Sequence, residues 1–174
     1  DELLAVDACE GRAFSIRECT RLIQRLGQSR PARWQHALGV VEWMRRQGEG
    51  LAPNAFTFNS LMTALESGGQ LPRALQVLEE MRAAGVPHSS FTYNTLIRAC
   101  GRAGDQGTAY ALLGRMREAG IQADAYTYGA LIAACNAAGD GEGALKTYAE
   151  MRAEGITPDG AAYSSLISAC GKAG

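Results

Sequence analysis

The chain has 174 residues, enough for one ordinary domain, and 17 Lys and Arg balance 18 Asp and Glu to a net charge of −1. Near-neutrality argues against a strong non-specific polyanion binder, which normally carries a clear basic excess. Apolar residues form 47% of the chain, as in a folded soluble protein, and no apolar run reaches bilayer length. We therefore expect a packed domain without membrane insertion.

The beginning of the chain carries the weakest pattern. Residues 1–19 fit an N-terminal helical segment or the end of an earlier repeat. Residues 20–54 form a degenerate repeat, because the Ala37-Leu38 pair and Met44 match Ala74-Leu75 and Met81 further along the chain. A glycine-rich stretch at residues 48–50 adds about two residues to this unit.

Regular repeats follow at residues 55–89, 90–124 and 125–159, and residues 160–174 hold the first helix of a truncated fourth unit. Equivalent positions recur every 35 residues (116−81 and 151−116): Met81, Met116 and Met151; Gly85, Gly120 and Gly155; Phe58, Tyr93, Tyr128 and Tyr163. A fixed period of this length is the signature of a solenoid of stacked supersecondary units. Because the last unit lacks its second helix, we expect the chain to be a piece of a longer array.

Each regular unit reads as two helices separated by small residues. In the middle unit the first helix ends near Ala103-Gly104, where glycine supplies a left-handed cap, and the second ends at Gly120. Helices of three to four turns with short connections form antiparallel hairpins, and no β-like alternation occurs. The expected fold is all-α. The aromatic positions at Phe58 and its equivalents are expected in the core.

Five cysteines are present, an odd number without CxxC pairs. Cys100, Cys135 and Cys170 occupy one slot, which holds Leu65 in the preceding unit. A slot that accepts Leu or Cys is a buried apolar slot. We therefore expect no metal site, no redox role and no cofactor.

Four motifs resemble the pentatricopeptide repeat family. They are the aromatic-Asn-x-Leu-Ile run at residues 93–97, Arg-Ala-Gly at 102–104, Met-Arg-x-x-Gly-Ile at 116–121 and Pro-Asp at 158–159. The resemblance implies a right-handed α-α superhelix that binds single-stranded RNA, one base per repeat. It also implies an organellar protein, in chloroplast or mitochondrion with the chloroplast preferred, that acts in transcript stabilisation, processing or translation.

The resemblance further implies which residues would contact RNA. Base selection would fall to Asn59 with Ser89, Asn94 with Asp124, Gly129 with Asp159, and Ser164. These pairs resemble readers of cytosine, uracil and, weakly, guanine, so a C-U-G-like core is expected. Base stacking would fall to Phe56, Phe91 and Tyr126, and phosphate contact to Arg102 and Lys172.

Structural explanations compete with these roles. Ser89, Asp124 and Asp159 each precede a helix, as does Asn54, and all four are favoured N-cap residues. No nucleophile, base and carboxylate cluster in the sequence, so we expect no catalytic residues and no enzyme activity. The alternative function is a helical scaffold for protein–protein contacts in an organellar ribosome or transcription assembly, which the near-zero net charge favours.

Overall fold

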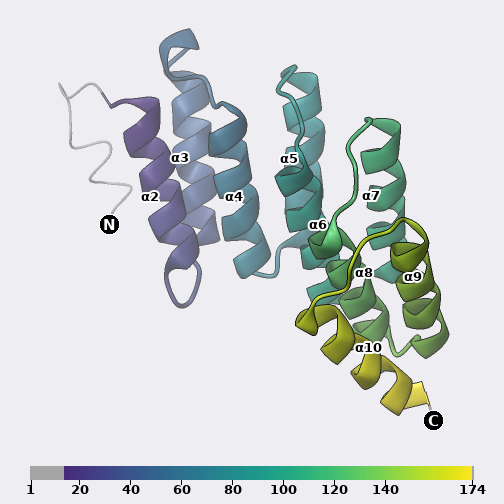
Figure 1. Cartoon of the computed structure of the whole chain (residues 1–174). Helices are drawn as coiled ribbons and strands as arrows, with labels where there is room; N and C mark the ends of the chain where they lie inside the picture. Colours follow the sequence, from purple (N-terminus) through teal and green to yellow (C-terminus); the bar gives the residue numbers. More distant parts are fainter. Residues whose placement is uncertain (1–13, 174) are drawn as a thin grey trace. The chain divides into compact units, whose positions relative to one another are not determined.

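The computed structural model describes residues 14–173 of the chain. Over these residues it contains nine α-helices and one 3-10 turn, with no strand (Figure 1). The all-α prediction is therefore confirmed, and none of these helices combines the length and apolarity needed to cross a membrane. Most of the expected segment 1–19 lies outside the described residues. The chain divides into two compact units, residues 1–87 and 88–174, each described by itself below.

The first unit contains two helix hairpins. Its elements are α2 (Ile16–Gln28), α3 (Trp34–Arg46), the 3-10 turn η1 (Glu49–Leu51), α4 (Ala55–Ser67) and α5 (Leu71–Ala83). The first helices of the two hairpins, α2 and α4, pack against each other, and each also packs against its own second helix. The approach of α2 to α4 is close at Gly27, where a Cβ atom would lie 2.8 Å from the Cβ of Ala64.

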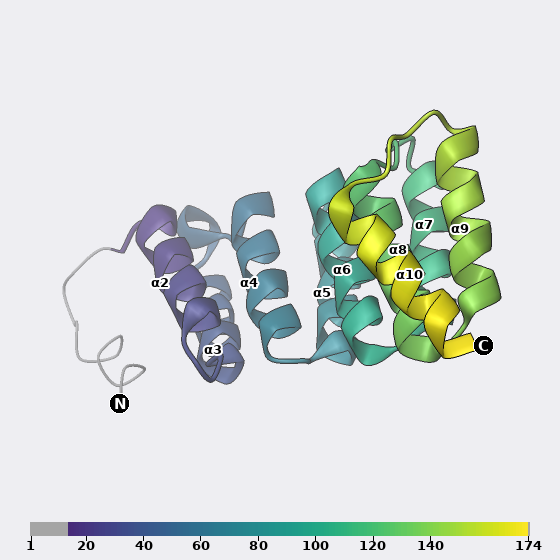
Figure 2. The ribbon, with the colours of Figure 1, turned by 60° about the horizontal axis from the view of Figure 1, so that its bottom comes forward.

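The second unit continues the pattern with two hairpins and one further helix. Its elements are α6 (Ser90–Ala103), α7 (Gln106–Glu118), α8 (Ala125–Ala138), α9 (Gly141–Ala153) and α10 (Gly160–Ala173). Within this unit the first helices α6, α8 and α10 pack side by side, and the second helices α7 and α9 pack against them (Figure 2). Equivalent positions on successive first helices are therefore neighbours.

Helix starts reveal how the degenerate repeat departs from the others. First helices begin 35 residues apart in the regular units (90−55, 125−90 and 160−125), but 39 apart between Ile16 and Ala55 (55−16). Two extra residues precede α3, which begins 18 residues after α2 (34−16) instead of 16 (71−55). The other two lie around η1, because α4 begins 21 residues after α3 (55−34) instead of 19 (90−71).

Local signals set the helix ends. The side chains of Asn54, Ser89 and Asp124 each accept a hydrogen bond from a backbone N–H in the first turn of α4, α6 and α8. The N-cap interpretation of these residues is confirmed. Gly104 and Gly139 end α6 and α8 with φ of 70° and 75°, a conformation that costs glycine little.

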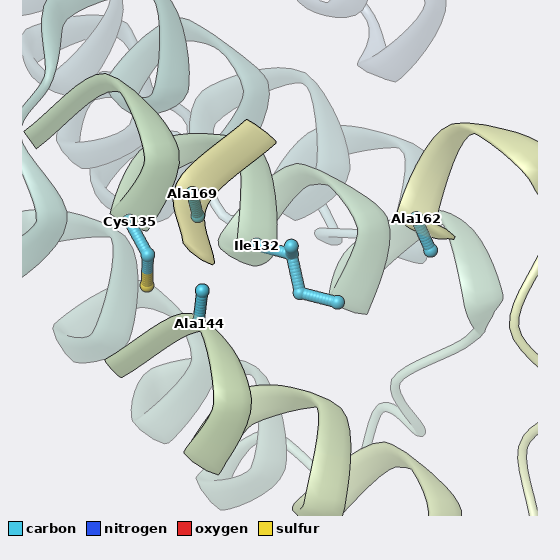
Figure 3. Close-up of a cluster of buried hydrophobic side chains, with 5 residues drawn as sticks. All are labelled: Ile132, Cys135, Ala144, Ala162 and Ala169. Carbon is cyan, nitrogen blue, oxygen red and sulfur yellow. The ribbon is translucent and has the colours of Figure 1, made fainter. Parts of the chain in front are cut away.

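The repeated apolar positions form the core. Leu61, Leu96 and Leu131 are buried, as are Phe58, Tyr93 and Tyr128. Figure 3 shows one cluster of the second unit, in which Ile132 and Cys135 from α8 lie with Ala144 from α9 and with Ala162 and Ala169 from α10. The alanines let these helices approach closely while the longer side chains interdigitate.

One prediction for the last helix is wrong. Tyr163 is 42% exposed, although the equivalent aromatic positions of the earlier helices are buried. Cys170 is exposed as well, whereas Cys100 and Cys135 are buried. The reason is that α10 contacts α8 and α9 on one side only, so within the described residues nothing covers its other face.

Candidate nucleic-acid interface

A hydrogen-bonded network joins the first helices of two successive repeats in the second unit. The Nδ2 of Asn94, on α6, donates to the two carboxylate oxygens of Asp124 at 3.3 and 3.5 Å. The hydroxyl of Thr127, in the first turn of α8, lies 2.6 Å from Asn94 Oδ1 and 2.9 Å from Asp124 Oδ1. Three polar side chains from two repeats therefore hold one another in place.

Burial separates the roles of these three groups. Thr127 is fully buried and Asn94 is only 7% exposed, whereas Asp124 is exposed. The backbone N–H of Thr127 donates to Asp124 Oδ1 at 2.8 Å, and the backbone N–H of Asp124 donates to Thr127 Oγ1 at 3.1 Å. The carboxylate is therefore fixed in orientation yet open to solvent, where it can accept a hydrogen bond from a ligand.

The same arrangement occurs in the first unit with different side chains. The hydroxyls of Thr20, on α2, and Thr57, in the first turn of α4, lie 3.0 Å apart. Asn54 caps α4 and accepts from the backbone N–H of Thr57 at 3.0 Å, as Asp124 does from Thr127. Thr20 therefore occupies the position of Asn94, and Asn54 that of Asp124. The sequence offered Thr20 as a candidate partner of Asn54, but the four extra residues left the alignment insecure.

The third regular pair is incomplete. Asp159 Oδ1 accepts from the backbone N–H of Ala162 at 2.8 Å, so the cap is present. Gly129 supplies no side chain, and a Cβ atom there would meet nothing within 4 Å. Alanine at 162 also replaces the threonine found at 57, 92 and 127. At this pair, residues 129 and 162 therefore provide no amide or hydroxyl side chain to hold the Asp159 carboxylate, as Asn94 and Thr127 hold Asp124.

The remaining expected base-selecting residues lie on α4, at the start of α6 and on α10. Asn59 is half-buried on α4 in the first unit, and Ser89 is exposed at the start of α6 in the second unit. Ser89 forms a reciprocal capping box with Thr92. Ser164 is exposed on α10 and donates its hydroxyl to the carbonyl of Gly160 at 2.8 Å. The structure therefore brings together Asn94 and Asp124 among the expected partners.

The three aromatic residues expected to stack on bases are large exposed side chains. Phe56, Phe91 and Tyr126 are 63%, 54% and 49% exposed, and each is the second residue of a first helix. Arg98, one turn after Asn94, lies over the Tyr126 ring at 5.9 Å from its centroid and donates to its hydroxyl. Sequence reasoning missed Arg98, although its spacing from Asn94 places both on one face of α6.

The two expected phosphate contacts are both exposed, at the C-terminal ends of first helices. Lys172 donates from Nζ to the carbonyl oxygen of Asn136 at 3.2 Å, so its ammonium group already has a protein partner. Arg102 lies in the last turn of α6, where a cation interacts favourably with the helix dipole.

The groups with the most strongly raised pKa values lie outside the Asn94–Asp124–Thr127 network. Burial raises the pKa of Cys100 to about 12 and that of Tyr128 to about 12. Such shifts move both groups away from proton exchange at neutral pH and follow from core packing. Among residues 14–173, no three His, Cys, Asp or Glu side chains gather in a way that could hold a metal ion.

Stacked helix hairpins with polar and aromatic residues at repeating positions define the class of α-helical repeat proteins. A model of the pentatricopeptide repeat family, described as the pentacotripeptide-repeat region of PRORP, matches residues 19–174. The chain belongs to the pentatricopeptide repeat family.

Individual relatives agree with this membership. Pentatricopeptide repeat-containing protein 10, chloroplastic, from Zea mays is 36% identical over 77 residues, which are 44% of this chain and 9% of that protein. The crystal structure of PPR10 in complex with an 18-nt psaJ RNA element matches 98% of this chain at 30% identity with a TM-score of 0.86. This chain covers 24% of that structure's chain.

A second solved structure has the same fold at lower identity. The PPR domain of Arabidopsis thaliana protein-only RNase P 1, in complex with tRNA, matches 91% of this chain at 19% identity with a TM-score of 0.73. This chain covers 83% of that domain. At this identity the match supports the fold alone.

Proposed function

We propose that this chain binds single-stranded RNA with one nucleotide per repeat, and that Asn94 and Asp124 select uracil. The observation that carries the proposal is the Asn94–Asp124–Thr127 network, which fixes an exposed carboxylate beside a buried amide. Uracil carries an N–H donor on its ring nitrogen, which a carboxylate accepts. Cytosine carries a lone pair at the equivalent nitrogen, which a carboxylate repels.

The exposed aromatic residues support the same function. Phe56, Phe91 and Tyr126 stand at the same helix position in three repeats, and aromatic–base stacking contributes about 1–3 kcal/mol per base. The PPR10 structure similar to this chain contains bound RNA. The family resemblance implies that the RNA runs 5′ to 3′ along the protein. With that polarity, the expected pairs, Asn59 with Ser89, Asn94 with Asp124, and Gly129 with Asp159, give a C-U-G-like core.

The relatives support a proposal for the cellular location and the mode of action of this protein. The matched maize protein is chloroplastic, and we propose a chloroplast location for this protein and action through RNA binding rather than catalysis. A role in transcript stabilisation, processing or translation fits a protein that acts by occupying RNA. A protein-binding scaffold is the second candidate, favoured by the net charge of −1 and by the engagement of Lys172 with Asn136.

Asp124→Asn tests base selection cleanly because Asn is as good an N-cap as Asp. Fluorescence anisotropy would compare short strands containing C-U-G and C-C-G for the wild type and the variant. We expect the wild type to prefer uracil by roughly 5-fold to 100-fold, and the variant to lose or reverse that preference. Wild-type affinity should also fall with salt, with a slope set by the phosphates contacted.

Two outcomes would contradict the proposal. Equal binding of both strands by the wild type would remove base selection at this pair. Absence of RNA binding under low-salt conditions would favour the scaffold function instead. Asn94→Ala is the less suitable variant, since Asn94 is buried and its loss also disturbs the packing of Thr127.

A further inference from the structure

First helices meet the first helix of the preceding repeat through small residues. In the second unit, a Cβ atom at Gly101 of α6 would lie 3.2 Å from the backbone oxygen of Ala130 and 3.5 Å from the backbone nitrogen of Ala134, both on α8. In the first unit, Ala64 of α4 lies against Gly27 of α2 in the same way (Figure 1). Side chains no larger than alanine allow two helices to cross this closely.

On α2 the two corresponding positions are arginines. The helices α2 and α4 begin 39 residues apart (55−16), so Arg25 corresponds to Ala64. Arg21 corresponds to Ser60, the α4 equivalent of Ala130. Ser60 and Ala64 are buried, whereas both arginines are exposed, and no carboxylate in the part of the chain that the structure describes pairs with either of them. Burying two unpaired guanidinium groups is costly, so this side of α2 is not suited to the close crossing between repeats.

A leucine accompanies the arginines on this side of α2. Leu22 follows Arg21 in the chain and corresponds to Leu61, a core leucine of α4 that is 1% exposed. The helices that pack on α2 in the described part of the chain, α3 and α4, leave Leu22 only half-buried. A partner that covered Leu22 would therefore gain apolar burial in addition to any ion pairs with the arginines.

An aromatic pair continues the same side onto α3. Phe14, just before α2, packs edge to face on Trp43 with 5.8 Å between the ring centroids, and both rings are half-buried. Trp43 corresponds to Glu80 of α5, whose carboxylate accepts from Arg45 of the preceding second helix at 2.6 Å. Trp43 therefore faces the side on which a preceding element would lie. Arginine and tryptophan are residue types that contribute most to binding at protein interfaces.

The α2–α3 hairpin is also the basic part of the chain. Residues 14–53 contain seven Arg and three Glu, a net charge of +4 (7−3). Residues 54–173 contain nine Lys and Arg and eleven Asp and Glu, a net charge of −2 (9−11). All seven cations of the hairpin are arginine, whose planar guanidinium group forms bidentate pairs with carboxylates. The charge of this side therefore calls for an acidic partner.

The spacing and the apolar residues favour a helix of a protein as that partner. Arg21 and Arg25 lie one turn apart on α2, about 6 Å along the helix axis, which matches carboxylates one turn apart on a second helix. The phosphates of RNA would match the charge equally well, but a sugar–phosphate chain offers little apolar surface to cover Leu22. An amphipathic helix offers both carboxylates and an apolar stripe.

We propose that this side of the α2–α3 hairpin binds an acidic amphipathic helix of a partner protein. Carboxylates one turn apart on that helix pair with Arg21 and Arg25, and its apolar stripe covers Leu22 and the Phe14–Trp43 pair. The inference goes beyond RNA binding and does not depend on it. Both arginines stand at positions that face a neighbouring helix in the other repeats, and not at the position of the aromatic residues proposed to stack on bases.

The test uses the 174-residue chain and a fluorescent synthetic peptide of three heptads, each Glu-Leu-Ala-Glu-Leu-Glu-Ala, which places leucines on one stripe and glutamates one turn apart. Fluorescence anisotropy would measure its binding. We expect Arg21→Gln combined with Arg25→Gln to weaken binding by about 10-fold or more. Affinity for the wild-type chain should fall as salt rises. A peptide of the same composition with its leucines spread around the helix should bind about 10-fold more weakly or not at all.

Arg30→Gln combined with Arg46→Gln is the matched control, because it removes the same charge from exposed arginines of the same hairpin that lie outside α2. It should change peptide affinity by less than about 2-fold. The inference is overturned if the two double variants act equally, if both peptides bind alike, or if neither binds at low salt.

Two further results would assign the surface to another occupant and overturn the inference. One is a uridine oligonucleotide that binds and loses affinity in the Arg21→Gln, Arg25→Gln variant while the peptide does not bind, which would indicate a nucleic-acid surface. The other is dimerisation of the wild-type chain that the same variant abolishes, measured by light scattering, which would indicate a second copy.

Discussion

Asn94 and Asp124 lie 30 residues apart in the chain, and the amide nitrogen of one donates to the carboxylate of the other at 3.3 Å. The contact forms because α6 and α8, the first helices of consecutive repeats, pack side by side. Thr127 completes the network from the first turn of α8. A position in one repeat and the cap of the next therefore act as one unit.

Asn94→Ala should lower stability. Asn94 is buried, and its Oδ1 accepts from the Thr127 hydroxyl at 2.6 Å. Removing the acceptor leaves a buried hydroxyl with a poorer partner, at a cost of about 1–3 kcal/mol. Urea unfolding of the chain measures the change. Ser164→Ala, at the equivalent exposed position of α10, should stay within about 0.5 kcal/mol, and equal losses in both variants would contradict the network.

Leu96→Ala should cost about 2–5 kcal/mol, because Leu96 is fully buried and its loss leaves a cavity. Leu166 occupies the same slot on α10 but is only partly buried. Leu166→Ala should therefore cost about 1 kcal/mol. Thermal unfolding of both variants would measure the two losses of stability. A loss at Leu166 larger than the loss at Leu96 would mean that α10 is more enclosed than the structure shows.

Gly129→Asn combined with Ala162→Thr should rebuild at the third pair the network seen at the second. A Cβ at Gly129 meets nothing within 4 Å, and replacing a helix glycine gains a few tenths of a kcal/mol. If the proposed RNA function holds, the double variant should prefer uracil over guanine at the third position. Anisotropy with C-U-U and C-U-G strands measures this preference, and an order unchanged from the wild type would show that the network does not select the base.

The cysteines should differ in reactivity. Cys170 is exposed, whereas Cys19, Cys100 and Cys135 are buried, and burial raises the pKa of Cys100 to about 12. Because the thiolate is the nucleophile, Cys100 should be nearly inert to iodoacetamide at pH 8. Peptide mapping after brief alkylation of the native chain should find Cys170 modified before the other three cysteines among residues 14–173. In urea the four residues should react at similar rates, and prompt native labelling of Cys100 would contradict its burial.

Much of the fold was predictable because its determinants are local. Glycine with positive φ at Gly104 and N-caps at Ser89 and Asp124 each act within one turn of a helix. The repeats carry these signals again every 35 residues, so the helix hairpins can be predicted without any tertiary information. The same locality explains why the prediction for Tyr163 on α10 was wrong, since exposure depends on the neighbouring helix and not on the residue itself.

By itself, the sequence determined the 35-residue period, the all-α class and the positions that become core. Only the tertiary structure decided that Thr20 lies against Thr57, the residue that Asn54 caps, and that Arg17 occupies the second helix position held by aromatic residues in the regular repeats. Four extra residues shift the register of the degenerate repeat and hide both relationships in the sequence. It also decided that Asn94 is buried against Thr127. Contacts between residues more than 30 positions apart depend on how helices pack, and helix packing has no local signature.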